Sequence, residues 1–153
     1  MNWPPIGRGC WILVGDGHHA IVFVNEGDAT DLRLVKVLER TRDIARNNQL
    51  GADRPGRSFS STTPRRSAYD SGDLHLAEKL EFIGEVVAEI NAAADKAAFE
   101  RLVLVAPPSV MKAYRDHLSH KAQKAIIAEL PKDLVKHTVI SVAEHLRAAS
   151  AAE

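Results

Sequence analysis

The first forty residues of the chain contain three short apolar runs, whose length is typical of β-strands. They cover Cys10–Val14, Ala20–Val24 and Leu32–Leu38. The dipeptide Asp16-Gly17 lies between the first two runs, and such a pair favours the positive φ angles of a tight hairpin turn. The pattern therefore predicts three sequential antiparallel strands.

The hydrophobic pattern stops between Glu39 and Gly72, where Ile44 and Leu50 are the main aliphatic residues. A connection of this length is uncommon inside a compact domain, and it is usually either functional or disordered. We therefore predict an exposed loop over about residues 40–72.

A helical period follows this loop. Apolar residues recur at alternating intervals of four and three positions, which places them on one face of a helix of about five turns. Ser71 or Asp73 is predicted to cap this helix. The apolar positions are Leu76, Leu80, Ile83, Val87, Ile90 and Ala94. Four glutamates on another side are predicted to form a solvated face, namely Glu78, Glu81, Glu85 and Glu89.

The second half of the chain alternates between strand and helix patterns. A buried strand is predicted at Arg101–Pro108, a helix at Ser109–Leu118, a strand at Lys124–Leu130 and an amphipathic helix at Thr138–Ser150. Strands joined through helices are expected to be parallel, with right-handed crossovers. The order βββαβαβα predicts one α/β domain across residues 1–153, with helices packed on a mixed sheet of about five strands.

The charge balance limits the choice of partners. The 153 residues include 20 basic and 20 acidic side chains, so an electrostatic partner has to be recognised by a local patch. With Cys10 as its one cysteine, the chain has no internal disulfide, and its start does not resemble a secretory signal. We expect a cytoplasmic protein with no membrane segment, and the sequence leaves a dimer open.

Arginines are concentrated in the predicted loop. Residues 40–66 hold seven arginines, two aspartates and no lysine. Guanidinium groups pair with phosphate or carboxylate through two parallel hydrogen bonds, and an aromatic ring among them offers a stacking face for an unpaired base. Two alternatives stay open: the arginines pair with the acidic helix that follows, or they bind an acidic protein. The predicted polyanion site consists of Arg46, Arg54, Arg57, Phe59, Arg65 and Arg66.

Catalytic chemistry has less support. Asp16 and Glu39 follow predicted strands and are candidates for a Mg²⁺-dependent nuclease, but no third carboxylate is evident and turn chemistry explains Asp16. His117 and His120 would share one side of a helix if it continues that far, yet two ligands do not make a metal site. Ser109 lacks the glycines of a nucleophile elbow. The sequence thus predicts no catalytic residue, no metal site and no cofactor.

Several stretches of the chain resemble the bacterial host-attachment protein family, the proteins required for attachment to host cells. These stretches are WILVGDGHHAIVFV, DRPGRSF, FERLVLVAPPSVM and AELPKDLVKHT, and the resemblance runs from about Trp11 to Leu146. That family is in turn similar to the middle domain of archaeal and eukaryotic peptide-chain release factors, which implies an RNase H-like fold.

In that release-factor domain, a loop with a Gly-Gly-Gln tip lies between the third strand and a long helix and triggers hydrolysis of peptidyl-tRNA. Here Arg40–Arg66 occupies the same position, and the chain has no Gly-Gly-Gln sequence. The resemblance implies a non-enzymatic binding protein whose arginine-rich loop contacts RNA, the ribosome or another polyanion, with an indirect role in host attachment. The alternative is a hydrolase on the same fold that cleaves a peptidyl-tRNA ester or acts as a metal-dependent nuclease.

Overall fold

The computed structural model describes residues 3–42 and 64–151, with side chains from residue 74 onward in the second range. The strands and helices follow the predicted order, with one additional short helix before the last strand. The elements are β1 (Trp11–Gly15), β2 (His19–Asn25), β3 (Leu34–Thr41), α2 (Pro64–Asp95), β4 (Leu102–Val105), α3 (Pro108–His117), α4 (His120–Ala125), β5 (Ile126–Leu130) and α5 (Val139–Ala151).

The five strands form one mixed sheet in the order β3-β2-β1-β4-β5. β2 is antiparallel to both β1 and β3, because these strands follow one another through short turns. β4 is parallel to β1 and to β5; α2 connects β3 to β4, and α3 and α4 connect β4 to β5. The predicted α/β fold, with three antiparallel strands followed by parallel ones, is confirmed.

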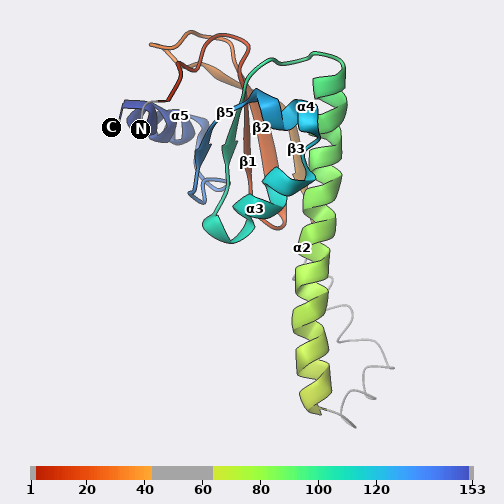
Figure 1. Cartoon of the computed structure of the whole chain (residues 1–153). Coiled ribbons are helices and arrows are strands. Elements are labelled where there is room, and N and C mark those ends of the chain that lie inside the picture. The colour runs from red at the N-terminus through yellow and green to blue at the C-terminus, as the bar shows by residue number, and fades with distance from the viewer. Residues whose placement is uncertain (1–2, 43–63, 152–153) are drawn as a thin grey trace.

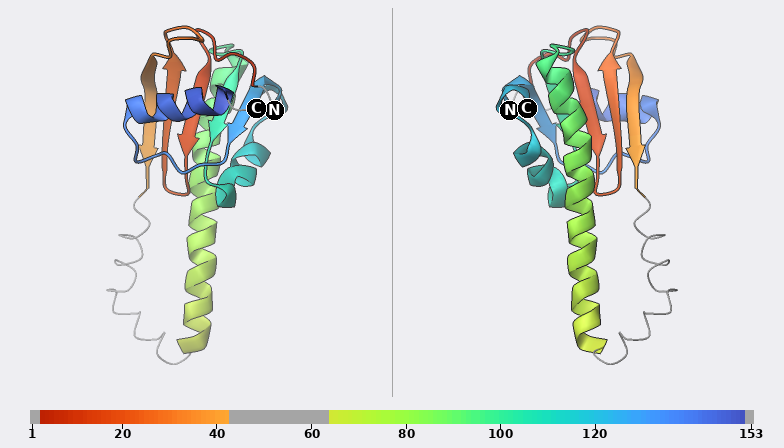
Figure 2. Two further views of the ribbon diagram at one scale, coloured as in Figure 1. Left: turned by 90° about the vertical axis from the view of Figure 1, so that its left-hand side faces the viewer. Right: turned by 90° about the vertical axis from the view of Figure 1, so that its right-hand side faces the viewer.

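Helices cover both faces of the sheet. α2, α3 and α4 lie on one face and α5 lies on the other, as two opposite views show (Figure 1, Figure 2). Alternation along β1 supplies both cores: Leu13 packs with Ile83 on the α2 face, whereas Ile12 and Val14 pack with Leu146 on the α5 face. The central strands therefore read as continuous apolar runs because both of their faces are buried.

The edge strand β3 contains a bulge. Val22 pairs with Leu38 and Phe23 pairs with Lys36, which leaves Val37 as the extra residue. Bulges and charged side chains at a sheet edge discourage pairing with another chain. β3 also starts and ends later than predicted, because its last residues face solvent and carry no apolar signal.

Two helices differ from the prediction. α2 begins at Pro64, ahead of both predicted capping residues, so part of the predicted loop has a helical backbone. Proline suits the first turn of a helix, where its missing N–H costs nothing. The predicted polar link after α3 contains α4, which Ser119 caps by accepting a hydrogen bond from the N–H of Ala122 at 3.2 Å. β5 accordingly begins two residues later than expected.

Candidate nucleic-acid interface

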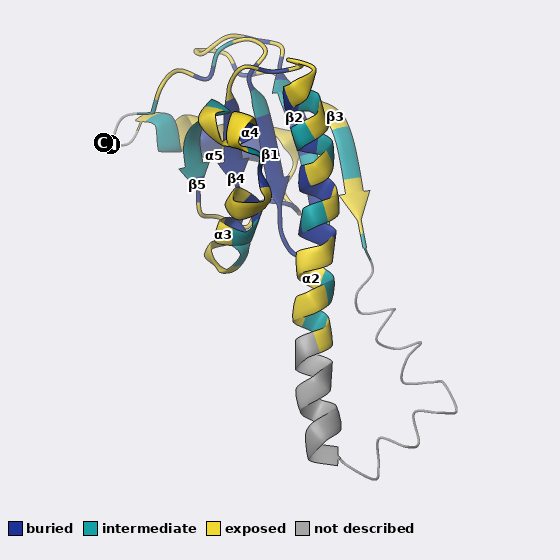
Figure 3. Ribbon diagram, turned by 45° about the vertical axis from the view of Figure 1, so that its right-hand side comes forward, coloured by how far each residue is buried: buried dark blue, intermediate teal, exposed yellow. Residues whose placement is uncertain are grey.

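Helix α2 is longer than the sheet on which it packs. Its 32 residues correspond to about 48 Å at 1.5 Å per residue. Glu81–Asp95, here called the packed half, lies on the sheet, and Pro64–Leu80, the projecting half, extends beyond it (Figure 1, Figure 3). The exposed fractions of Leu74, Leu76 and Leu80 are 59%, 57% and 40%. Leu76 and Leu80 therefore continue the apolar spacing of the packed half but are exposed.

The turn between β1 and β2 marks the boundary between these halves. Oδ1 of Asp16 accepts hydrogen bonds from the backbone N–H groups of His18 and His19 at 2.9 and 2.8 Å. Gly17 lies against Lys79, since a Cβ built on this glycine would be 2.8 Å from Cγ of the lysine. The Asp16 carboxylate thus holds the turn that contacts α2, in agreement with the turn-chemistry interpretation.

Helix α3 fixes the same end of β1. The buried hydroxyl of Tyr114 donates a hydrogen bond to the backbone carbonyl of Asp16 at 2.6 Å. Burial raises the pKa of Tyr114 well above its ordinary value, so the hydroxyl stays protonated and acts as a donor. A Cβ on Gly15 would overlap this hydroxyl, which is why a glycine ends the strand.

Two arginines at the end of β3 bind the acidic side of α2. Nη1 of Arg42 donates to Oε1 of Glu81 at 2.9 Å, and its Nη2 donates to both carboxylate oxygens of Glu85 at 2.8 Å. Nε and Nη2 of Arg40 donate to the two oxygens of Glu89 at 2.8 and 2.7 Å. We call these five residues the root, because they tie β3 to α2 next to the point where α2 leaves the domain.

The root corrects one prediction and confirms an alternative. The glutamates do not form a simple solvated face, since three of them bind arginines of β3. The alternative in which loop arginines pair with the acidic helix is correct for Arg40 and Arg42. Exposed ion pairs of this kind contribute about 0.2–1 kcal/mol each, so the root adds little to stability and holds the end of β3 against α2. The backbone N–H of Arg42 adds to this by donating to the carbonyl of His18 at 2.8 Å.

Glu39 precedes Arg40 in β3, and both oxygens of its carboxylate have side-chain partners. One carboxylate oxygen accepts from Nζ of Lys36 at 2.8 Å, and the other lies 2.7 Å from Nε2 of His19. The hydrogen bond from Lys36, followed by that from His19, lowers the pKa of Glu39. This carboxylate therefore pairs with two side chains at the edge of the sheet.

The residues of the predicted polyanion site follow Arg42 in the sequence, and the last two of them belong to the projecting half. Arg46, Arg54, Arg57 and Phe59 lie outside the described residues. Arg65 and Arg66 belong to the first turn of α2 by their backbone, and their side chains also lie outside the described part. The structure thus describes both ends of the connection but not the site itself.

The histidine pair does not share one helix. α3 ends at His117 and α4 begins at His120, so the condition for bringing both imidazoles to one side fails. Across residues 3–42 and 74–151, no three or more metal-ligating side chains converge. In the same part of the chain, no helix combines the length and apolar character needed to cross a bilayer.

The fold is similar to that of a translation termination factor. It is similar to the crystal structure of the archaeal translation termination factor aRF1, with a TM-score of 0.50 and 11% sequence identity over 92% of this chain. The chain corresponds to 36% of the length of that protein. At this level of identity, the likeness shows the fold alone.

The sequence identifies the family. Residues 9–146 match bacterial archaeo-eukaryotic release factor family 12, and the chain belongs to this family. The uncharacterized protein RP470 of Rickettsia prowazekii (strain Madrid E) is 24% identical over 135 residues, which cover 86% of this chain and 87% of that protein. The predicted release-factor likeness is therefore confirmed.

Proposed function

We propose that this protein is a non-enzymatic binding protein whose arginine-rich connection between β3 and α2 binds RNA, with the ribosome as its site of action. Membership of a release-factor family supports this proposal, as does the position of the arginines between a third antiparallel strand and a long helix. The function needs no catalytic group, because binding follows from charge and from the geometry of guanidinium groups.

One observation carries the proposal, namely the division of the arginines into two groups. Arg40 and Arg42 are matched by glutamates of α2. Residues 43–66 hold five further arginines and only two aspartates. Because the root already occupies Glu81, Glu85 and Glu89, these carboxylates are not free to neutralise the remaining arginines. An excess of guanidinium groups over the carboxylates of the same stretch, with Glu81, Glu85 and Glu89 already paired, favours an external polyanion.

Phosphate is the partner that best fits this chemistry. A guanidinium binds phosphate through paired N–H donors, and an aromatic ring such as that of Phe59 stacks on single-stranded bases. A role in host attachment would then be an indirect consequence of RNA binding inside the cell. Both this role and the cytoplasmic location stay predictions.

The hydrolase alternative has less support from the residues. Asp16 holds a turn, and Glu39 is engaged by Lys36 and His19. The chain also has no Gly-Gly-Gln sequence. Binding without hydrolysis is therefore the function that we put forward.

Equilibrium binding to a labelled ribosomal RNA fragment at low salt tests the proposal. We expect the replacement of Arg54, Arg57, Arg65 and Arg66 by serine to weaken binding at least tenfold, since four phosphate contacts are lost. The double variant Arg33→Ser/Arg147→Ser is the control, because these exposed arginines form no ion pair among the described residues. Unaltered affinity of the quadruple variant would overturn the proposal.

A further inference from the structure

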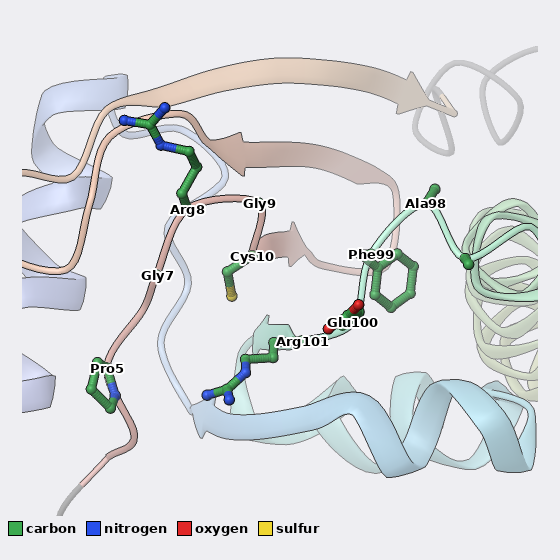
Figure 4. A pocket seen from close by; sticks show the side chains of 10 residues that line it. Pro5, Gly7, Arg8, Gly9, Cys10, Ala98, Phe99, Glu100 and Arg101 are labelled. Carbon is green, nitrogen blue, oxygen red and sulfur yellow. The ribbon is translucent and has the colours of Figure 1, made fainter.

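A cavity of about 460 Å³ lies at the end of the sheet opposite the projecting half. One wall is the segment before β1, from Pro5 to Cys10, and the other is the connection between α2 and β4, from Ala97 to Arg101 (Figure 4). The volume is within the range of about 300–1,000 Å³ that is typical of sites for small molecules. The functional site proposed above makes no use of this cavity.

Both walls contain backbone in the left-handed region. Gly9 has a φ of 87° and Ala97 a φ of 57°, and both residues line the cavity. Ala97 ends α2 in this conformation, while the N–H of Ala98 donates to the carbonyl of Ala93 at 2.9 Å. Glycine would adopt the same conformation without strain.

The wall formed by Phe99, Glu100 and Arg101 offers hydrogen-bond donors. No protein acceptor in the described part of the chain pairs with the backbone N–H of any of these three residues. The carbonyl of Arg101 accepts a hydrogen bond from the backbone N–H of Trp11 at 3.0 Å. Consecutive free N–H groups suit an anion.

Two arginines add positive charge. Arg8 and Arg101 line opposite walls (Figure 4), and neither forms an ion pair within the described residues, in contrast to Arg40, Arg42 and Arg115. Nε of Arg8 donates to the carbonyl of Gly27 at 3.4 Å, so this guanidinium is directed toward the β2–β3 connection (Figure 4). Glu100 is the one carboxylate of the lining.

The remaining lining is neutral. Burial raises the pKa of the Cys10 thiol to about 11, against the opposing effect of Arg101, so this side chain is uncharged at neutral pH. Pro5 and Phe99 contribute apolar surface. A ligand with an anionic group and a compact apolar or planar part matches this combination of charge, free N–H donors and apolar walls.

We propose that the cavity binds a small phosphorylated molecule of the mononucleotide class, with its phosphate held by Arg101 and by the backbone N–H groups of Phe99–Arg101. This site is separate from the RNA-binding function, since it lies at the other end of α2 and involves none of the loop arginines.

Titration with adenosine 5′-monophosphate, inorganic phosphate and adenosine, followed by amide chemical shifts, tests this site in the full chain. We expect the monophosphate to bind and to shift the resonances of residues 97–101, inorganic phosphate to bind more weakly at the same residues, and uncharged adenosine to leave them unchanged. Arg101→Gln should weaken binding of the monophosphate about tenfold, as expected for loss of a charged hydrogen bond. Arg33→Gln is the matched control and should bind like the wild type.

A second variant blocks the cavity without removing charge. A Cβ on Gly7 would meet no atom within 4 Å, so Gly7→Leu should fill the space, keep the melting temperature and abolish binding. Absence of any shift at millimolar monophosphate, or equal losses in Arg101→Gln and Arg33→Gln, would overturn the proposal. Full binding by a folded Gly7→Leu protein would do the same. None of these outcomes depends on whether the loop arginines bind RNA.

Discussion

Apolar residues keep one spacing along α2 from Leu76 to Ile90, yet only those in the packed half are covered. In the packed half, Ile83, Val87 and Ile90 are completely buried against the sheet. In the projecting half, Leu76 and Leu80 continue the same series and are exposed. The spacing of apolar residues thus defines a face of the helix, but the length of the sheet decides how much of that face is buried.

At the boundary between the halves, the β1–β2 turn and the root contact α2. Gly17 of the β1–β2 turn lies against Lys79, and Arg42 pairs with Glu81 and Glu85 one turn further along. The packed half is therefore an ordinary core helix, and the projecting half is held at a defined angle by contacts at its base. The difference separates residues that stabilise the domain from residues available to a partner.

The largest effect is expected from truncating equivalent positions in the two halves. Ile83→Ala should lower the free energy of unfolding by about 3 kcal/mol, because it leaves a cavity in the core. Leu76→Ala should change it by less than about 0.5 kcal/mol, as for an exposed side chain. Urea denaturation monitored by circular dichroism measures both. A cost above about 1.5 kcal/mol for Leu76→Ala would show that something covers the projecting half in solution.

A smaller effect is expected where α3 holds the β1–β2 turn at the boundary. Gly15→Ala should cost about 1–3 kcal/mol, since its Cβ would overlap the Tyr114 hydroxyl and force a shift. In a Tyr114→Phe background the same substitution should cost less, because the overlapping oxygen is gone. Gly7→Ala is the control, as open space surrounds that position. Strictly additive effects of the two substitutions would contradict the contact.

The C-terminal end of α2 allows a stabilising change. Ala97→Gly should raise the free energy of unfolding by about 0.5–1 kcal/mol, because glycine adopts a positive φ without strain. Ala92→Gly, at an exposed position inside the helix, should lower it by a similar amount. Thermal denaturation compares the two variants. A loss of stability in both would mean that Ala97 is not strained.

The smallest effect is expected at the root. Arg42→Gln should cost about 0.5 kcal/mol at low salt and less at high salt, since its glutamate partners are exposed. Double-mutant cycles with Glu85→Gln measure the coupling between the two side chains. A coupling free energy that does not change between low and high salt would contradict an exposed electrostatic contact.

The central strands and the packed half of α2 could be predicted because burial on both sides leaves a continuous or periodic apolar signal. The start of α2 could not be predicted, since a helix that projects from the domain does not need an apolar face and Pro64 begins it without one. The last residues of β3 were missed for the same reason. The spacing of apolar residues indicates which elements are buried, and it does not indicate the elements that face solvent.

The root and the cavity show a second limit. Arg40 and Glu89 are 49 positions apart, so their pairing depends on how β3 and α2 meet and not on any local pattern. The acidic spacing of Glu81, Glu85 and Glu89 on one side of a helix was the available signal. The left-handed conformation of Ala97 gives no signal at all, because alanine rarely adopts it.

The salt dependence of ribosome binding tests the central claim most directly, because it counts the phosphate contacts that each group of arginines makes. Sedimentation with ribosomes over a range of salt concentrations should give a slope of log affinity against log salt that falls by about 3 when Arg54, Arg57, Arg65 and Arg66 are replaced by serine. Replacing Arg40 and Arg42 by glutamine should leave the slope unchanged, because those two side chains bind glutamates of α2. The account is contradicted if the quadruple variant keeps the wild-type slope, or if the slope falls with Arg40 and Arg42 instead.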